Sequence, residues 1–211
     1  HPSIVAANGW TSSDLLSTLQ GTRFSEVFDV VTVMVGVNNQ YRGESVSRYG
    51  RELGHLLESA VSAAGGKRDN VWLLNIPDWQ LSPYGKDSAP QGNGGIDDFN
   101  RAAKRVAEKH RVNWLDISAH IEQGKFDNQY FVRDGLHYSR KMHMLWAMDL
   151  ANKIQQKQNK KRYRTFASSQ VSLMLSFNNY TLLPLSLWPL ETTEPLICLP
   201  FLDFCYFKSG R

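Results

Sequence analysis

Cysteine is absent from the first 156 residues of the 211-residue chain, and its two cysteines, Cys198 and Cys205, lie near the end. This absence excludes a disulfide framework and thiolate metal sites from the larger part of the chain. It does not indicate a compartment, because a domain of this size folds without covalent links. The sequence opens at His1 with no recognisable signal peptide, so localisation is not predicted.

An excess of charge of either sign is also absent from this part. The first 156 residues hold 17 of the 24 Lys and Arg residues and 17 of the 20 Asp and Glu residues. The formal net charge of +4 therefore belongs to residues 157–211. A protein that binds nucleic acid through its folded body would carry positive charge there, so we expect no nucleic-acid partner.

Apolar runs alternate with helical patterns in residues 1–156. We expect strands over residues 3–7, 29–35, 70–76 and 112–117, a helix after a capping box at 11–14, and helices over 44–64, 96–111 and 139–156. This alternation predicts an α/β fold with a parallel sheet between layers of helices. In such sheets, ligands bind beyond the carboxyl ends of the strands. The loops at 8–11, 36–43 and 77–95 and the segment around 134–137 are therefore expected at one rim.

Residues 157–211 lack this periodicity. A basic cluster opens this tail, no charged residue occurs from Thr165 to Leu190, and four prolines lie from Pro184 onward. The stretch 171–190 has the length of a membrane span but is diluted by asparagine, threonine and serine. We therefore expect a second region, 157–211, without packed structure, and membrane contact through it is the less favoured alternative.

Asp134 and His137 form the strongest candidate for a chemical site. A histidine that acts as general base needs a carboxylate at Nδ1 to fix its tautomer, and Gly135 permits the tight turn that brings Asp134 back to His137. The alternative is that Asp134 caps a turn and His137 fills a gap beside the last helix. A D-x-x-H motif alone favours this structural alternative, because it is short and common.

Two further candidates follow earlier strands. The amide of Asn38 could donate a hydrogen bond to an oxyanion, and the backbone N–H of Gly9 could do the same. Alternatively, Asn38 stabilises its own turn and Gly9 serves backbone geometry alone. The order Gly9, Asn38, Asp134-x-x-His137 at successive strand ends favours one shared site.

These positions resemble the conserved blocks of the GDSL, or SGNH, serine hydrolases. Asn8-Gly9-Trp10 resembles the glycine block, residues 36–39 (Gly-Val-Asn-Asn) the G-x-N-D block, and residues 134–137 (Asp-Gly-Leu-His) the terminal D-x-x-H block. The resemblance covers residues 1–156. Asn39 stands where aspartate is usual.

The resemblance implies a flavodoxin-like, three-layer parallel sheet and hydrolysis of acyl esters, of a lipid or of an acylated carbohydrate, without a cofactor or a metal. His137 would be general base and then general acid, Asp134 would orient it, and Gly9 and Asn38 would bind the oxyanion. Asn39 and Trp79 would contact a small-molecule ester. The acyl specificity is not predicted, and the complete domain is expected to be a monomer.

No Gly-Asp-Ser occurs in the chain, although the resemblance places the nucleophile on a strand before Gly9. We therefore expect a truncated domain that lacks the first, central strand of the sheet and is inactive or nearly so. The alternative is a non-catalytic protein that keeps the pocket and binds a ligand there.

Overall fold

A computed structural model of the chain describes residues 3–22, 24, 26–86, 95–174 and 204–207, with side chains up to residue 162. The chain divides into two compact units, which are described separately. The first unit comprises His1–His143 with Leu199–Arg211, and the second comprises Met144–Cys198. The predicted boundary after residue 156 lies within the second unit.

The first unit contains a sheet of five short strands: β1 (Ser3–Ile4), β2 (Val30–Val33), β3 (Val71–Leu74), β4 (Asn113–Leu115) and β5 (Phe204–Phe207). Their order is β1-β5-β2-β3-β4. β2, β3 and β4 are parallel neighbours, which confirms the predicted α/β fold with its parallel sheet. The buried faces of β2 and β3 explain their continuous apolar sequences.

β5 lies between β1 and β2 and runs antiparallel to both. Cys205 is the Cα partner of Ile4 on one side and of Thr32 on the other. The place where we expected a missing central strand is therefore occupied by a segment of the tail, which we expected to lack packed structure. Its insertion gives the inner edges of β1 and β2 hydrogen-bonding partners, whereas open strand edges would expose unpaired backbone groups.

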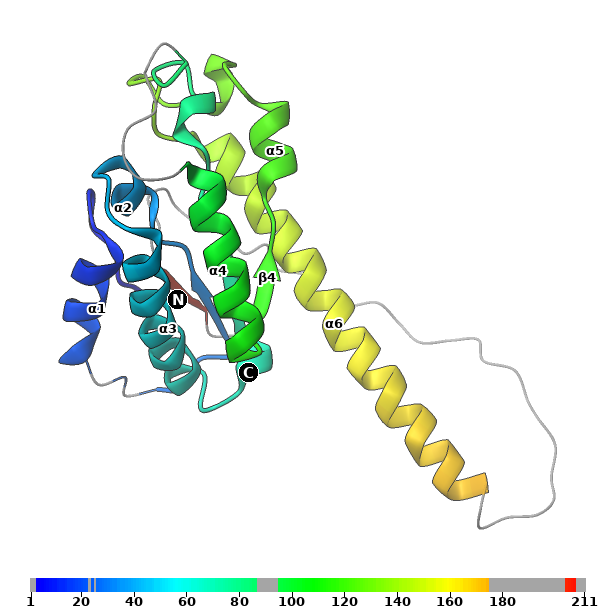
Figure 1. Cartoon of the computed structure of the whole chain (residues 1–211). Helices are drawn as coiled ribbons and strands as arrows, with labels where there is room; N and C mark the ends of the chain where they lie inside the picture. The colour runs from blue at the N-terminus through cyan, green and yellow to red at the C-terminus, as the bar shows by residue number, and fades with distance from the viewer. Residues whose placement is uncertain (1–2, 23, 25, 87–94, 175–203, 208–211) are drawn as a thin grey trace. The chain divides into compact units, whose positions relative to one another are not determined.

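Helices α1 (Ser12–Gln20), α3 (Val46–Ala63) and α4 (Ile96–His110) lie side by side over the sheet (Figure 1). The predicted capping box is present, because Thr11 accepts a hydrogen bond from the Asp14 N–H and Asp14 accepts one from the Thr11 N–H. The predicted apolar stripe of α3 is fully or almost fully buried, and it comprises Leu53, Leu56, Leu57, Ala60 and Val61. These helices fix the loops that follow the strands.

Several short helices were not predicted. They are α2 (Val37–Tyr41), α5 (Ser118–Gln123) and the 3₁₀ turns η1 (Arg68–Asn70), η2 (Trp79–Leu81) and η3 (Asn128–Tyr130). Each has one or two turns, which is too short for an apolar repeat to be visible in the sequence. Residues 36–43, predicted as a loop, therefore contain a helix that begins directly after Gly36.

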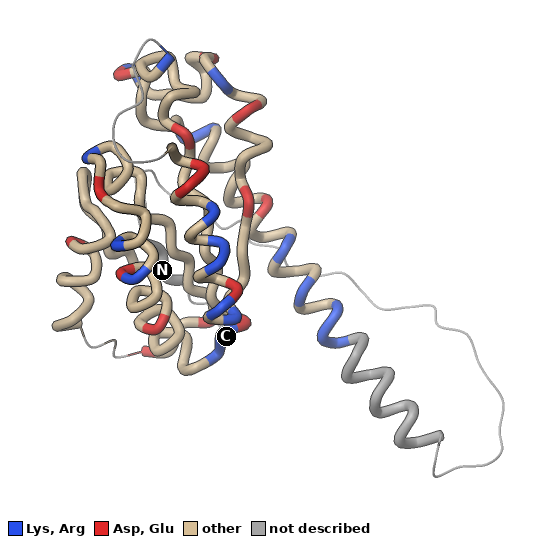
Figure 2. The backbone as a smooth tube through the Cα atoms, viewed as in Figure 1, with Lys and Arg blue, Asp and Glu red and all other residues tan. Residues whose placement is uncertain are grey.

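The last helix, α6 (Arg140–Met174), continues well beyond the predicted end at residue 156. Its sequence contains no proline or glycine that would end it earlier. Figure 2 shows Lys and Arg positions recurring along its described middle part. In the sequence, the basic residues of residues 150–162 are Lys153, Lys157, Lys160, Lys161 and Arg162. Among the described residues, no helix combines the length and the apolar composition needed to cross a membrane, and residues 175–190 of the apolar stretch lie outside them.

Candidate active site

The Asp134–His137 segment is the tip of a small hairpin. Phe131 and Tyr138 form an antiparallel bridge, and the Val132 N–H donates to the His137 carbonyl at 2.8 Å. Gly135 has a positive φ of 69°, a conformation that glycine adopts without a steric penalty. The turn thereby brings the side chain of Asp134 back onto the imidazole of His137.

The Asp134 carboxylate holds both the backbone and the imidazole of this turn. Its Oδ1 accepts hydrogen bonds from the N–H groups of Leu136 at 2.8 Å and His137 at 2.9 Å, and its Oδ2 lies 2.6 Å from His137 Nδ1. Desolvation raises the pKa of Asp134, but the hydrogen bonds from the His137 side chain and the two N–H groups outweigh it and lower the pKa to about 2. The carboxylate is therefore ionised at neutral pH.

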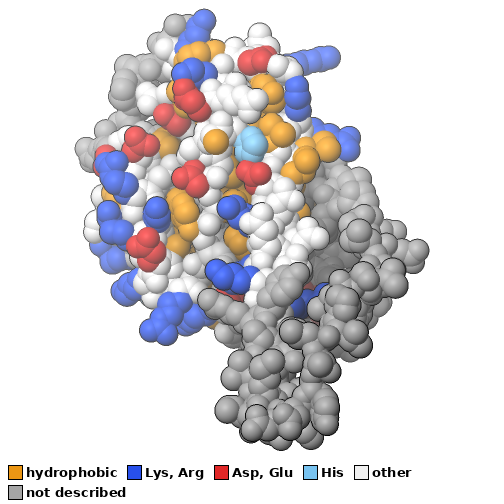
Figure 3. Space-filling view, turned by 90° about the vertical axis from the view of Figure 1, so that its right-hand side faces the viewer, with side chains coloured by type: hydrophobic (Ala, Val, Ile, Leu, Met, Phe, Trp, Pro, Cys, Tyr) orange, Lys and Arg blue, Asp and Glu red, His pale blue; other side chains and the backbone are white. Residues whose placement is uncertain are grey.

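Both members of this pair are accessible. Their side chains are each 48% exposed. Figure 3 shows a histidine at the surface beside an acidic side chain, with hydrophobic side chains around both. A carboxylate at Nδ1 fixes the tautomer and orientation of the imidazole, as a general base requires.

Gly9 lies in a tight turn between β1 and α1. The Trp10 N–H donates to the Ala7 carbonyl at 3.3 Å, and Gly9 has a φ of 79°, as the third residue of a type II turn requires. Arg42 Nη2 donates to the Gly9 carbonyl at 2.6 Å. The arginine, which the sequence did not single out, therefore fixes the orientation of the peptide after Gly9.

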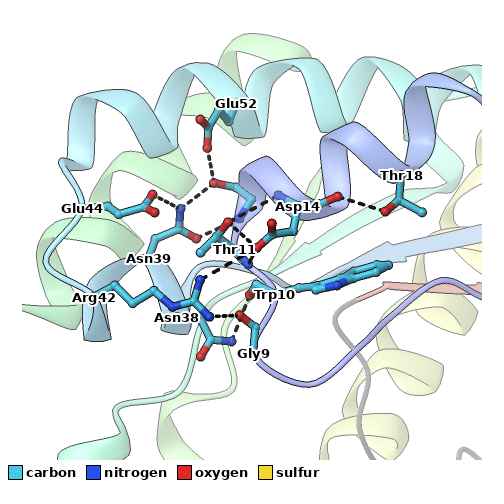
Figure 4. A network of polar contacts seen from close by, with 11 residues as sticks. Gly9, Trp10, Thr11, Asp14, Thr18, Asn38, Asn39, Arg42, Glu44 and Glu52 are labelled. Atoms are coloured by element: carbon cyan, nitrogen blue, oxygen red, sulfur yellow. Dashed lines mark hydrogen bonds and ion pairs between the residues drawn. The ribbon is translucent and has the colours of Figure 1, made fainter.

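Asn38 lies on α2, directly after β2. Its Nδ2 donates to the Trp10 carbonyl at 2.9 Å, so the structure brings Asn38 and the Gly9 turn together (Figure 4). An asparagine amide carries two N–H bonds. The hydrogen bond to the Trp10 carbonyl uses one of these N–H groups. Because the amide is planar, this bond also fixes the direction of the other N–H group.

Asn39 and Trp79, which we expected to contact substrate, have a different environment. Asn39 is fully buried, and its amide is bonded to Ser12 and Glu44. Trp79 is 4% exposed, and its Nε1 donates to Gln40 at 2.8 Å. Burial of both side chains favours a role in holding the site together rather than the expected direct contact with substrate.

The loop after β3 contacts both α2 and the turn that contains Asp134 and His137. Trp79 bonds to Gln40 on α2, next to Asn39, and the Tyr84 N–H donates to the Gly135 carbonyl at 3.0 Å. A short segment thus links the helix that carries Asn38 to the turn that carries His137. The longer loop that we predicted here continues into residues 87–94, which lie outside the described residues.

Within the described residues, no group of three or more His, Cys, Asp or Glu side chains could hold a metal ion. The candidate groups are a carboxylate and an imidazole that contact each other in one turn, and an amide that lies beside the backbone N–H groups of the Gly9 turn. They suit proton transfer and stabilisation of an oxyanion.

Comparison with known proteins identifies a family for most of the chain. The profile of the family described as GDSL-like Lipase/Acylhydrolase matches residues 1–145. A comparison with curated protein sequences finds no match.

Several solved structures share the fold. A lipase/acylhydrolase from Enterococcus faecalis is 21% identical over 70% of this chain and 72% of that chain, with a TM-score of 0.52. A mutant of an acetyl-xylooligosaccharide esterase from Geobacillus is 19% identical over 69% and 68%, with a TM-score of 0.53. An alpha/beta hydrolase enzyme from the metagenome of Lake Arreo is 20% identical over 69% and 68%, with a TM-score of 0.54.

Proposed function

Since the chain belongs to the GDSL-like lipase/acylhydrolase family, we propose that its rim serves the hydrolysis of acyl esters, with His137 as general base and then general acid. The observation that carries this proposal is the 2.6 Å contact between His137 Nδ1 and Asp134 Oδ2. A proton held at Nδ1 by the carboxylate leaves Nε2 as the basic nitrogen, and the carboxylate stabilises the imidazolium that forms.

Gly9 and Asn38 would stabilise the oxyanion of the tetrahedral intermediate. The amide of Asn38 is anchored through one N–H on the Trp10 carbonyl, so its second N–H is held in place before substrate binds. The Gly9 N–H belongs to a turn whose following peptide is fixed by Arg42. Removal of one such preorganised donor typically lowers kcat by about 10²–10³.

The nucleophile is the missing component, because the sequence contains no Gly-Asp-Ser. We therefore propose that the 211-residue chain supplies the base, its orienting carboxylate and two oxyanion donors, and that it has little or no esterase activity alone. A site of this kind without its nucleophile retains only weak catalysis from the oxyanion hole and binding.

The test compares the chain with a fusion that carries a β-strand and a Gly-Asp-Ser segment ahead of Ser3 and that ends at residue 156, so that β5 does not occupy the place of the added strand. Both are assayed with a short-chain aryl ester. We expect turnover only from the fusion, a loss of about 10⁴ or more in kcat on His137→Ala, and a loss of about 10³–10⁴ on Asp134→Asn, which leaves the wrong tautomer.

Two results would contradict this proposal. Hydrolysis by the unfused chain that disappears in His137→Ala would show that this chain is active without the added segment. An active fusion that tolerates His137→Ala would remove the histidine from the reaction.

The absence of Gly-Asp-Ser also supports a second candidate, a non-catalytic protein that binds an ester or a related ligand at the same rim. Calorimetry of the unfused chain with a non-hydrolysable ester analogue tests it. Binding that weakens in Asn38→Ala, together with a fusion that gains no activity, would favour the binding protein over the enzyme.

A further inference from the structure

Three consecutive amide side chains on α2 each hold a different part of the rim. Asn38 donates to the Trp10 carbonyl, Asn39 binds Ser12 at the start of α1, and Gln40 accepts from Trp79 in the loop after β3. α2 is therefore the element to which the other strand-end segments are attached. The contact made by Asn39 is the most buried of these and involves the most hydrogen bonds.

The amide of Asn39 clasps Ser12 at two points. Its Oδ1 accepts from the Ser12 N–H at 2.9 Å, and its Nδ2 donates to Ser12 Oγ at 2.8 Å (Figure 4). Both residues are 0% exposed. The second Nδ2 hydrogen donates to Glu44 Oε2 at 2.9 Å, and the Glu44 N–H donates to the Asn39 carbonyl. Both N–H bonds of this amide are therefore used.

Two carboxylates accept hydrogen bonds from the Asn39–Ser12 pair, and they limit which side chains position 39 can hold. Glu44 accepts from Asn39, and Glu52 on α3 accepts from Ser12 Oγ at 2.6 Å. Arg48 pairs with the other oxygen of Glu52, Oε1, at 2.7 Å, and within the described part of the chain it is bonded to neither Asn39 nor Ser12. An acidic side chain at position 39 would meet these two carboxylates with no N–H to offer, and the repulsion between like charges is strong where water is excluded.

The remaining charged groups near the clasp do not offset this repulsion. Asp14 on α1 adds a third carboxylate, which is bonded within its own capping box with Thr11. Arg42 is directed at the Gly9 carbonyl and lies 4.0 Å from Asp14. The described charges on α1, on α3 and in the loop after α2 thus favour a neutral amide donor at position 39.

We propose that Asn39 is a positioning residue: its buried, neutral amide sets the register between the Gly9 turn and Asn38, and Glu44 requires the amide at this position. Two bridges join the segments, one from Asn38 to Trp10 and one from Asn39 to Ser12, and on each segment the two bridging residues lie within two positions of each other. Displacing one bridge therefore displaces the other. The catalytic meaning of this inference rests on the proposed function, whereas the placement of Asn38 does not.

A matched control is present in the same unit. Asn75, which is 2% exposed, accepts from the Ile117 N–H at 2.7 Å and donates to Ser118 Oγ at 2.8 Å, so it clasps the start of α5 as Asn39 clasps the start of α1. Among the described residues, its hydrogen bonds join it to Leu115, Ile117 and Ser118 and not to Gly9 or Asn38. Asn75→Asp therefore measures the general cost of an acidic residue in such a clasp.

The test is ¹H–¹⁵N NMR of the 211-residue chain, following the side-chain amide of Asn38 and the backbone N–H of Gly9. We expect Asn39→Asp to displace both signals at neutral pH. The carboxyl that it introduces would have a raised pKa beside Glu44 and Glu52, so the displacement should shrink as the pH is lowered and a proton is taken up. Asn75→Asp should leave both signals in place at every pH.

A compensating variant makes the test specific. In Asn39→Asp/Glu44→Gln the donor and the acceptor are exchanged, since an amide at position 44 can donate to the introduced carboxylate. We expect this double variant to restore the Asn38 and Gly9 signals at neutral pH. Where Asn39→Asp alone does not fold, Ser12→Ala replaces it: loss of the hydroxyl should displace the Asn38 signal while the chain stays folded.

The inference is overturned if Asn39→Asp or Ser12→Ala leaves both signals unmoved in a folded chain, or if the Glu44 exchange restores nothing. In the active fusion, a displaced Asn38 should lower kcat by about 10²-fold with little change in KM. A fusion with no activity at all would count against the proposed function, while the NMR result would still decide the role of Asn39.

Discussion

The ring of Tyr49 lies against Gly36 so closely that a Cβ at position 36 would be 2.6 Å from Tyr49 Cε2. Gly36 also has a φ of 130°, which side-chain-bearing residues rarely adopt. Tyr49 is buried, and its hydroxyl donates to the Val35 carbonyl at 3.0 Å. A side chain of α3 therefore packs against the start of α2 and helps to fix the position of Asn38.

Gly36→Ala should destabilise the chain by about 2–5 kcal/mol, because it adds both a steric overlap and backbone strain. Urea unfolding followed by circular dichroism measures the change. Gly21→Ala is the matched control, since a Cβ there meets nothing within 4 Å and the backbone is αR. We expect the control to lie within about 0.5 kcal/mol of the parent. Equal effects of the two substitutions would contradict the packing described.

Tyr49→Phe should cost about 1 kcal/mol through loss of the hydrogen bond to the Val35 carbonyl. Burial raises the pKa of Tyr49 well above its ordinary value. The folded chain therefore holds this phenol neutral, and stability should fall as the pH rises above about 10, where the unfolded chain ionises. The variant should show a shallower alkaline decline in melting temperature, and an unchanged decline would show that Tyr49 does not contribute.

Glu58 joins α3 to the end of α4, because its Oε1 lies 2.6 Å from His110 Nδ1 and 3.3 Å from Arg68 Nη1. Hydrogen bonds from Arg68 and His110 lower the pKa of Glu58. A lowered pKa gives stability above the ordinary glutamate pKa of about 4.3, and this stability is lost as the pH falls. Glu58→Gln should therefore cost up to about 1 kcal/mol at pH 7 and almost nothing at pH 3.

Thermal melts at both pH values test this expectation, with Glu108→Gln on α4 as the control. A cost of Glu58→Gln that is the same at pH 3 and pH 7 would mean that the charge of Glu58 is not what stabilises the contact.

The pairing of β5 with β2 predicts that a cysteine introduced at position 32 forms a disulfide bond with Cys205. Thr32 and Cys205 are Cα partners in an antiparallel pair, and opposed residues in such pairs lie within the Cα distance that a disulfide spans. In a Cys198→Ser background, Thr32→Cys should form an intramolecular disulfide under mild oxidation, which mass spectrometry of a digest detects. Thr18→Cys on α1 should not. Equal cross-linking at both positions would indicate that β5 does not hold this place.

The sequence was sufficient for those elements whose apolar pattern is continuous. β2, β3, α3 and α4 follow from runs or stripes that are buried against one another, and the capping box at Thr11 follows from its own residues. The contact between Asp134 and His137 also follows from local spacing, because Gly135 permits the turn. The catalytic roles of these residues stay predictions.

The remaining features depend on tertiary pairing, which local sequence does not encode. α2 contains three consecutive amides, and the partners Ser12 and Trp79 lie 27 and 39 residues away, so the burial of these amides depends on segments distant in the sequence. Asn39 and Trp79 have side chains that suit ligand contact, and only the packing of Ser12, Gln40 and Glu44 shows that they are engaged within the protein. β5 carries no periodic pattern, and its place depends on two strands near the other end of the chain.

The order of synthesis gives the position of β5 a further consequence. Residues 204–207 leave the ribosome after every other strand of the sheet, yet they lie between β1 and β2, which leave it among the first. Until then, β1 has no neighbour in the described sheet, whereas β2, β3 and β4 can already pair. Contacts between such distant segments form slowly, because closing a long loop costs entropy before any pairing repays it. Closure of this sheet therefore waits for the strand that comes last in the chain, and β1 should gain protection from hydrogen exchange later than β2, β3 and β4.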